Sequence, residues 1–480
     1  MNSFSSNERK SKLLINILVF ITVLFNFMFL IGTGYVKQFF LDSIPQYPIS
    51  VDNRIDNFYR QTEAFANGQL QFLDDTKELQ SLNDPYEFTE RSGIDYLFDT
   101  SYYKGNYYSY YTIIPIVFVL LPIYLISHKF LNLVIVNLLI LSLSIYVLSK
   151  LYYKIIKDCI PNIPMYLYII GFLTMIFGSN MFLLLRGLKY DIAVSCGILF
   201  LISSIYFLYS ILDLKKIKLK FILAGICTAF VVLSKPTYIV YYLLIMYIAL
   251  NIIKKTNTQK YLFYYLMPII VIGIFQMIYN YARYDSIFEF GAKYQLTGFN
   301  VINYINNASY SRVFRAFKYY ICQLPRIDFM QFPYVFMNIS YDNKLYDVYL
   351  YENLITGLIL YPIIILSIIL CFGIKKDRIL AKLKNCLIVL YIIFFILVII
   401  NAIFAGVSEI YSLDFKFMLM IVGVIYILKY IDVVGYKKLL TCVFIICSIL
   451  NILFILPISY SGEGLCFLDN LKSIRNSHNK

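Results

Sequence analysis

Long apolar stretches separated by short polar ones fill most of this chain of 480 residues. Ten of the stretches have the length that a helix needs to cross a bilayer, and an eleventh, at 220–234, is shorter. The pattern predicts an all-α, polytopic integral membrane protein in which residues 1–480 form a single transmembrane domain of about eleven helices. The ten longer stretches run approximately over residues 13–33, 130–149, 163–185, 190–211, 237–253, 261–280, 349–372, 380–405, 413–430 and 437–458.

A further apolar run at 112–127 decides the topology. If this run crossed the membrane, the later basic loops "DLKKIKLK", "NIIKKTNTQK", "GIKKDR" and "YKK" would face outward. Lysine and arginine favour cytoplasmic loops, so we expect 112–127 to be a re-entrant or surface helix that does not span. The chain is then a multi-pass protein of the cell membrane with its N-terminus in the cytoplasm.

This topology places two large polar loops, 34–111 and 281–348, outside the cell. The first carries six Lys or Arg against twelve Asp or Glu, a net charge of −6, and the second carries seven against five, a net charge of +2. The short turns "LLRGLKYD", "LSKPT" and "AGVSEIYSLD" fall on the same side. Loops of this length are usually functional, so we expect the functional site on the extracytoplasmic face.

Composition narrows the chemistry further. Hydrophobic residues make up 60% of the chain and the mean hydropathy is +0.70, so the net charge of +14 reflects membrane orientation rather than binding of nucleic acid. Only two histidines are present, which excludes a His-based metal centre or a Ser-His-Asp triad. The sequence predicts no cofactor and leaves a divalent metal open. The chain has 47 tyrosines and no tryptophan, so tyrosine must anchor it at the membrane surface.

The first polar loop contains "DNRIDNFYRQTEAFANGQL", the pattern of a short surface helix that starts at Asp56 and ends at Gly68. Asp56 either caps this helix or acts as a general base that takes a proton from an acceptor hydroxyl.

Charged residues also cluster at the ends of the spans. In "LLRGLKYDIAVS", Arg186 and Lys189 either reach the lipid headgroups, with Asp191 paired to one of them, or bind the phosphate of a lipid-linked substrate. Lys235 in "LSKPT" lies at a comparable depth, next to a proline that ends its helix.

The second polar loop carries basic residues at helical spacing. Arg312, Arg315 and Lys318 lie three apart in "SRVFRAFKYY", on one face of a helix that either rests on anionic lipid or clamps a phosphate. Upstream, "NYARYDSIFEFGAKYQLTG" carries polar groups suited to holding sugar hydroxyls, namely Arg283, Asp285, Glu289, Lys293 and Gln295.

The order of these features resembles the GT-C membrane glycosyltransferases, specifically the group of protein O-mannosyltransferases and lipid A aminoarabinose transferases. The motifs "GQLQFLDD", "LSKPTY", "FEFGAKYQLTG" and "EIYSLDF" are most similar to uncharacterised bacterial membrane proteins usually assigned to that superfamily. The resemblance covers about two thirds of the chain in scattered patches. It implies a GT-C-like fold and transfer of a sugar from a polyprenyl phosphate on the outer side of the membrane.

The resemblance also assigns residues. The family's catalytic acid falls on Asp56, and its second acid is Asn57 here. Asp191 and Lys235 fall on turn positions of the family. The segment "DTSYYKGNYYSYYTIIP" would line the mouth of the site, where a sugar stacks on tyrosine rings, or would form an aromatic belt that anchors the 112–127 helix. Its members include Lys104, Tyr107 and Tyr108.

The sequence therefore predicts an inverting glycosyltransferase that moves a sugar from a polyprenyl-phosphate donor to a glycan, lipid or protein acceptor of the cell envelope. Asp56 would deprotonate the acceptor, and Arg186, Lys189 or Lys235, with Arg312 and Arg315, would stabilise the departing phosphate. One alternative is a polysaccharide polymerase or ligase that uses polyprenyl-diphosphate glycans. A second alternative is a flippase or transporter of lipid-linked glycans, which would need ionisable groups near the bilayer midplane.

Overall fold

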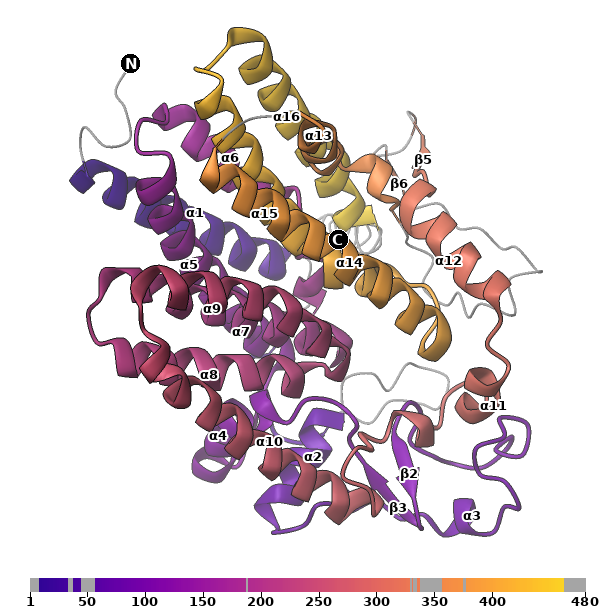
Figure 1. The fold of residues 1–480 in the computed structure, drawn as a ribbon. Helices are drawn as coiled ribbons and strands as arrows, with labels where there is room; N and C mark the ends of the chain where they lie inside the picture. Colours follow the sequence, from indigo (N-terminus) through magenta and orange to yellow (C-terminus); the bar gives the residue numbers. More distant parts are fainter. Residues whose placement is uncertain are drawn as a thin grey trace, which may run out of the picture.

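The computed structural model describes residues 8–32, 38–44, 57–186, 189–328, 330, 335–336, 356–373 and 377–461. Within this part, eight helices are long and apolar enough to cross a membrane, so the chain is a helical multi-pass membrane protein (Figure 1). They are α5 (Leu133–Cys159), α7 (Lys189–Ser210), α8 (Ile217–Ser234), α9 (Tyr242–Thr256) with the preceding 3₁₀ turn η5 (Pro236–Tyr241), α10 (Leu262–Tyr284), α14 (Arg378–Phe404), α15 (Glu409–Val433) and α16 (Lys438–Ser461).

Three further apolar helices lie at the other predicted spans. They are α1 (Glu8–Gly32), α6 (Met165–Phe177) and α13 (Pro362–Cys371). A helix thus occurs at each of the eleven predicted stretches, while the number that cross the membrane and the GT-C type of the fold remain predictions. Residues 349–355 of the predicted span 349–372 lie outside the described residues.

The predicted stretch 163–185 is not one helix, and this corrects the sequence-based prediction. α6 has 13 residues, or about 20 Å at 1.5 Å per residue, which is short of the ~30 Å hydrocarbon layer. Asn180 follows at a positive φ of 61°, and the 3₁₀ helix η3 (Met181–Arg186) completes the stretch. At the break, Asn451 Nδ2 donates to Gly178 O at 2.7 Å, and a Cβ on Gly178 would approach the same nitrogen to 2.7 Å. Tertiary contacts therefore stabilise a break that hydropathy does not reveal.

A short helical segment forms within residues 112–127. It consists of the π-helix η2 (Ile116–Leu120) and α4 (Leu121–Ser127), five and seven residues long. At most about 18 Å in length, the segment cannot cross the hydrocarbon layer alone. Ile116 is buried against α2 (Asn57–Ala66), while Phe118 and Ile126 are exposed. The short length favours the expected re-entrant or surface helix, and its position in the membrane stays a prediction.

The two polar loops assemble together at one end of the helix bundle (Figure 1). Ser101 and Gln295 form a β-bridge, and Arg91 Nη2 donates to Thr297 O at 2.5 Å, so residues far apart in sequence contact each other here. The elements of this region are α2, α3 (Lys77–Gln80), the hairpin β2 (Ser101–Tyr103) and β3 (Asn106–Tyr108), η7 (Ala292–Tyr294), α11 (Val301–Asn306) and α12 (Tyr310–Cys322). Two more strand pairs join β1 (Phe40–Leu41) to β4 (Phe130–Leu131) and β5 (Arg326–Ile327) to β6 (Val335–Phe336).

The predicted short helix at the start of the first loop is confirmed. α2 begins at Asn57, and the chain turns at Gly68, which has a φ of 71°. Asn57, Phe58 and Gln61 are buried, so the helix is packed into the protein on one side and does not lie free on the surface.

α10 is fixed to the bundle through a close contact with α8. Most of α10 faces outward, with Phe263 69% and Phe275 68% exposed. At Gly225 of α8, an added Cβ would lie 2.2 Å from the carbonyl oxygen of Tyr265 in α10. Close approach of two helix backbones is what small residues permit in membrane proteins.

We therefore expect Gly225→Ala to push α8 and α10 apart and to lower the free energy of unfolding by about 1–3 kcal/mol. Thermal unfolding of the purified protein in detergent, followed by circular dichroism, would measure this loss. Gly273→Ala in α10 is the matched control, because nothing lies within 4 Å of its Cβ position. An equal loss of stability in both variants would contradict the proposed contact.

Candidate functional site

A buried carboxylate, Asp99, lies where the polar loops meet the helix bundle. It is 1% exposed and accepts hydrogen bonds from the hydroxyls of Tyr110 at 2.9 Å and Tyr111 at 3.0 Å. The Tyr190 hydroxyl at the start of α7 and the Gln295 amide of the second loop also donate to it. Burial raises the pKa of Tyr110 and Tyr111 well above the usual range, so both hydroxyls keep their protons and remain donors.

The backbone around Asp99 explains how the sequence builds this network. Asp99 has a φ of 57°, in the left-handed region that aspartate tolerates better than most residues. Its N–H donates to Leu296 O at 2.7 Å, and Leu296 N–H donates to Thr100 O at 2.9 Å. Asn57 Nδ2 donates to Asp99 O at 3.2 Å, and Asn57 Oδ1 accepts from the Thr100 hydroxyl at 3.0 Å. The start of α2, directly after Asp56, is thereby tied to the Asp99 loop.

A second polar group forms between the end of α8 and the start of α15. Lys235 Nζ donates to Asp414 Oδ2 at 2.5 Å, and the Tyr238 hydroxyl donates to Asp414 Oδ1 at 2.8 Å. The Lys235 ammonium also lies 4.9 Å from the centre of the Tyr411 ring, within the range of a cation–π contact. Lys235 lies between α8 and η5 with an extended backbone, because the residue before a proline disfavours the helical conformation. Pro236 then starts the helical turn η5.

The two groups are neighbours. Tyr411 lies close enough to Tyr190 and Tyr110 for their hydroxyls to interact electrostatically. The Tyr238 ring packs directly against α7, where a Cβ on Gly197 would come within 2.3 Å of it. The ends of α7, α8 and α15 therefore gather the Asp99 network and the Lys235–Asp414 pair into one region, which we take as the candidate site.

A third polar cluster, also on α15, is closed from all sides. Glu409 is 1% and Lys416 0% exposed, and their charged groups are 3.0 Å apart. Lys416 Nζ also donates to the carbonyl of Thr356 and to its hydroxyl at 3.1 Å, while Glu409 accepts from Asn180 Nδ2 at 3.0 Å. With so many partners, this cluster fastens Thr356 and Asn180 to α15 rather than offering groups to a substrate.

The structure brings together only some of the predicted site residues. Lys235 is part of the candidate site, and Asp191 is fully buried beside Tyr190 at the start of α7. Asp56 lies outside the described residues, as do the side chains of Arg186 and Lys189, although their backbones end η3 and begin α7.

The predicted residues of the tyrosine-rich hairpin point elsewhere. Lys104 is 70% exposed at the hairpin turn and pairs with Asp285 at 2.7 Å; the hydrogen bond from Lys104 lowers the pKa of the Asp285 carboxyl. Tyr107 is buried in an apolar cluster, and its hydroxyl accepts from Leu97 N–H at 3.2 Å. Tyr108 packs edge-on against the Tyr284 ring. The tyrosines that reach Asp99 are instead Tyr110 and Tyr111, which lie just after the hairpin.

Arg283 and Glu289 hold the loops together. Arg283 is 4% exposed and donates to Ser109 O at 2.5 Å, just before the tyrosines of the Asp99 network. Glu289 accepts from Gly291 N–H at 2.7 Å and pairs with Lys293 at 3.0 Å. Both charged side chains therefore bind groups of the protein itself.

Two basic residues of α12, Arg312 and Arg315, bind other groups of the protein. Arg312 is 3% exposed and donates to Tyr304 O at 2.8 Å and Asn307 O at 3.1 Å, at the end of α11. Arg315 donates to the Ser311 hydroxyl at 3.4 Å. Phe314, by contrast, is 74% exposed on α12, so the buried face of this helix carries Arg312.

Sequence reasoning missed the residues that form most of the site. Asp99, Tyr190, Tyr411 and Asp414 were not among the predicted site residues, whereas Gln295 was named as a polar group of the second loop. The signal for Asp414 was present, because an acid inside an apolar span marks a functional or paired group. α15 buries the acids Glu409 and Asp414 together with Lys416 and Lys429.

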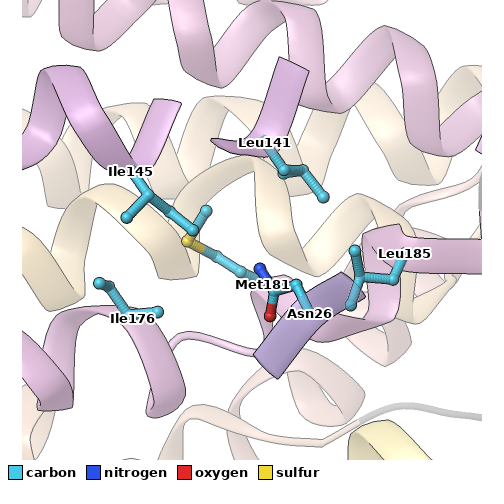
Figure 2. A pocket seen from close by; sticks show the side chains of 6 residues that line it. All are labelled: Asn26, Leu141, Ile145, Ile176, Met181 and Leu185. Carbon is cyan, nitrogen blue, oxygen red and sulfur yellow. The ribbon is translucent and has the colours of Figure 1, made fainter. Parts of the chain in front are cut away.

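Other features of the described residues add no chemistry to this site. No three His, Cys, Asp or Glu side chains come together there as a metal-binding group. A pocket between α1, α5, α6 and η3 is lined by apolar side chains around Asn26 (Figure 2). Asn26 Oδ1 is buried and has no hydrogen-bond partner in the described part of the chain.

Comparison with known proteins adds no relative. No protein-family model, no curated protein and no solved structure matches the chain. The resemblance to GT-C glycosyltransferases therefore stays a prediction from the sequence motifs.

We expect Asp99→Asn to loosen the polar loops from the bundle, because hydrogen bonds to a charged group contribute about 1.5–3 kcal/mol each. Hydrogen exchange in peptides from 96–112 should then speed up roughly tenfold or more. Asp285→Asn is the matched control, since the exposed pair with Lys104 contributes only about 0–1 kcal/mol. Unchanged exchange in the Asp99 variant would show that the network does not hold the loops.

Proposed function

We propose that this protein is a membrane glycosyltransferase that moves a sugar from a polyprenyl-phosphate donor to an acceptor of the cell envelope on the extracytoplasmic side. The observation that carries the proposal is the meeting of the Asp99 network and the partly exposed Lys235 at one end of a membrane helix bundle. A lipid-linked sugar donor can reach a site at the end of the bundle from the bilayer, and a polar acceptor can reach the same site from water. Cationic and hydroxyl groups there suit a phosphorylated sugar.

We assign the donor phosphate to Lys235, and we assign Arg186 and Lys189, from the turn before α7, as further cationic residues. Lys235 is at the end of α8 and its side chain is 15% exposed. Arg186 and Lys189 flank the junction of η3 and α7, directly before Tyr190. Charge-assisted hydrogen bonds from these groups would bind the phosphate and stabilise the charge that grows on it as it leaves.

Asp56 is assigned the role of general base. It precedes Asn57, whose side chain is bonded to the Asp99 loop, so the chain connects the base directly to the candidate site. In the proposed reaction Asp56 takes the proton of the acceptor hydroxyl, and the oxygen attacks the anomeric carbon from the face opposite the phosphate. The bond between that carbon and the phosphate oxygen breaks, its electron pair leaves with the phosphate, and the configuration inverts.

We expect Asp56→Asn to reduce sugar transfer by roughly 10²–10⁴-fold, because the variant cannot accept the acceptor's proton. The rate is measured with the purified full chain and a polyprenyl-phosphate sugar, and mass spectrometry of surface glycans with the gene present or deleted identifies the product. Glu63→Gln in α2 is the matched control and should keep near-normal turnover. Near-normal turnover of the Asp56 variant would remove Asp56 from this role, and absence of transfer by the unaltered protein would reject the function.

A further inference from the structure

The Lys235–Asp414 pair differs from the other buried pair of α15 in what its lysine can still bind. The Lys416 ammonium donates to Glu409 and to two oxygens of Thr356, so its three donors are used. The Lys235 ammonium donates to Asp414, and the described residues supply no second hydrogen-bond acceptor for it. An ammonium has three donors, so donor capacity remains at Lys235.

Burial is divided unequally within the pair. The Asp414 side chain is 0% exposed and the Lys235 side chain 15%. The carboxylate is thus fully enclosed, whereas the lysine side chain keeps partial exposure. The rings of Tyr238 and Tyr411 approach the ammonium to 5.5 Å and 4.9 Å from their centres, and aromatic rings favour a cation without using up its hydrogen-bond donors.

Asp414 is itself held in place from several sides. Tyr238 donates to its carboxylate at 2.8 Å, the Tyr241 hydroxyl donates to its backbone carbonyl, and Asn401 lies beside the carboxyl. Tyr238 in turn rests against Gly197 of α7, where any side chain would displace the ring. Two tyrosines of η5 thus hold Asp414 by hydrogen bonds, and α7 holds the Tyr238 ring in place. Asp414 in turn sets the position of the Lys235 ammonium.

We propose that Asp414 is a positioning residue, which sets the Lys235 ammonium where it binds the phosphate group of the lipid donor. This inference rests on the proposed function, which supplies the phosphate. A buried ion pair adds little net stability, so the placement of a charge explains this pair better than a contribution to folding does. The phosphate gains negative charge as it leaves, so a well-placed ammonium acts more strongly on the transition state than on the bound donor.

A double-mutant cycle tests the inference. Asp414→Asn should lower kcat roughly tenfold or more, with the KM for the donor changed by less than about threefold. Lys235→Met should lower kcat at least as much. Because Asp414 acts only through Lys235, the double variant Lys235→Met/Asp414→Asn should be no slower than Lys235→Met alone. The double variant also guards against misfolding, since it leaves no unpaired buried charge.

Lys129→Met/Asp42→Asn is the matched control, because it removes an exposed lysine–aspartate pair whose charged groups are 2.8 Å apart. Its kcat should stay within about twofold of the unaltered protein, as expected for a surface pair. If the losses of the two single variants at Lys235 and Asp414 multiply in the double variant, or if Asp414→Asn turns over normally, Asp414 is not a positioning residue.

A binding measurement separates failure of this inference from failure of the proposed function. The full chain in lipid nanodiscs should bind polyprenyl phosphate roughly tenfold to a hundredfold more tightly than the corresponding polyprenol, and the double variant at Lys235 and Asp414 should lose that preference. If the double variant loses the preference as expected but the unaltered protein transfers no sugar, the phosphate site is supported and the transferase function is rejected. If sugar is transferred and the double variant keeps the preference, the transferase function stands and the assignment of Lys235 and Asp414 falls.

Discussion

The buried carboxylate of Asp99 is the contact on which the arrangement of the polar loops depends. An ionised side chain can be buried only if neighbouring groups replace its water, and here donors from the first loop, the second loop and α7 do so. These donors come from three different parts of the chain. The same network therefore closes both loops over the end of the bundle and places Tyr190 and Gln295 beside the start of α2.

The helix bundle is subject to a second constraint, because the bilayer supplies no water to bind polar backbone groups. Breaks in the helices occur where a side chain can satisfy the interrupted backbone, as at the carbonyl of Gly178, or where a proline starts a new turn, as after Lys235. Both breaks lead toward the candidate site. Irregular backbone inside a membrane protein is tolerated where it lies within protein, and here it brings Lys235 and η3 to the ends of α7 and α15.

The two ion pairs of α15 illustrate how similar sequence features acquire different roles. Glu409 and Lys416 are closed within the protein and bonded to residues from two distant segments. Asp414 and Lys235 have the same chemistry, but the lysine reaches the surface of the site. A lysine with spare hydrogen-bond donors can bind a ligand, whereas a lysine whose donors are all used only holds protein segments together. Only the folded structure shows that Lys235 is of the first kind and Lys416 of the second.

The sequence by itself determined the membrane class, the places of the apolar helices and the short segment at 112–127, because hydrophobic length is a property of consecutive residues. It also identified Lys235 as a charged residue at the end of a span. Tertiary structure decided the rest: Arg283 and Arg312 bond to backbone carbonyls, Tyr107 lies in a core, and Tyr110, Tyr190, Gln295 and Asp414 form the site. The partners of these polar side chains come from segments far apart along the chain, and no local pattern of residues records which distant segment folds against them.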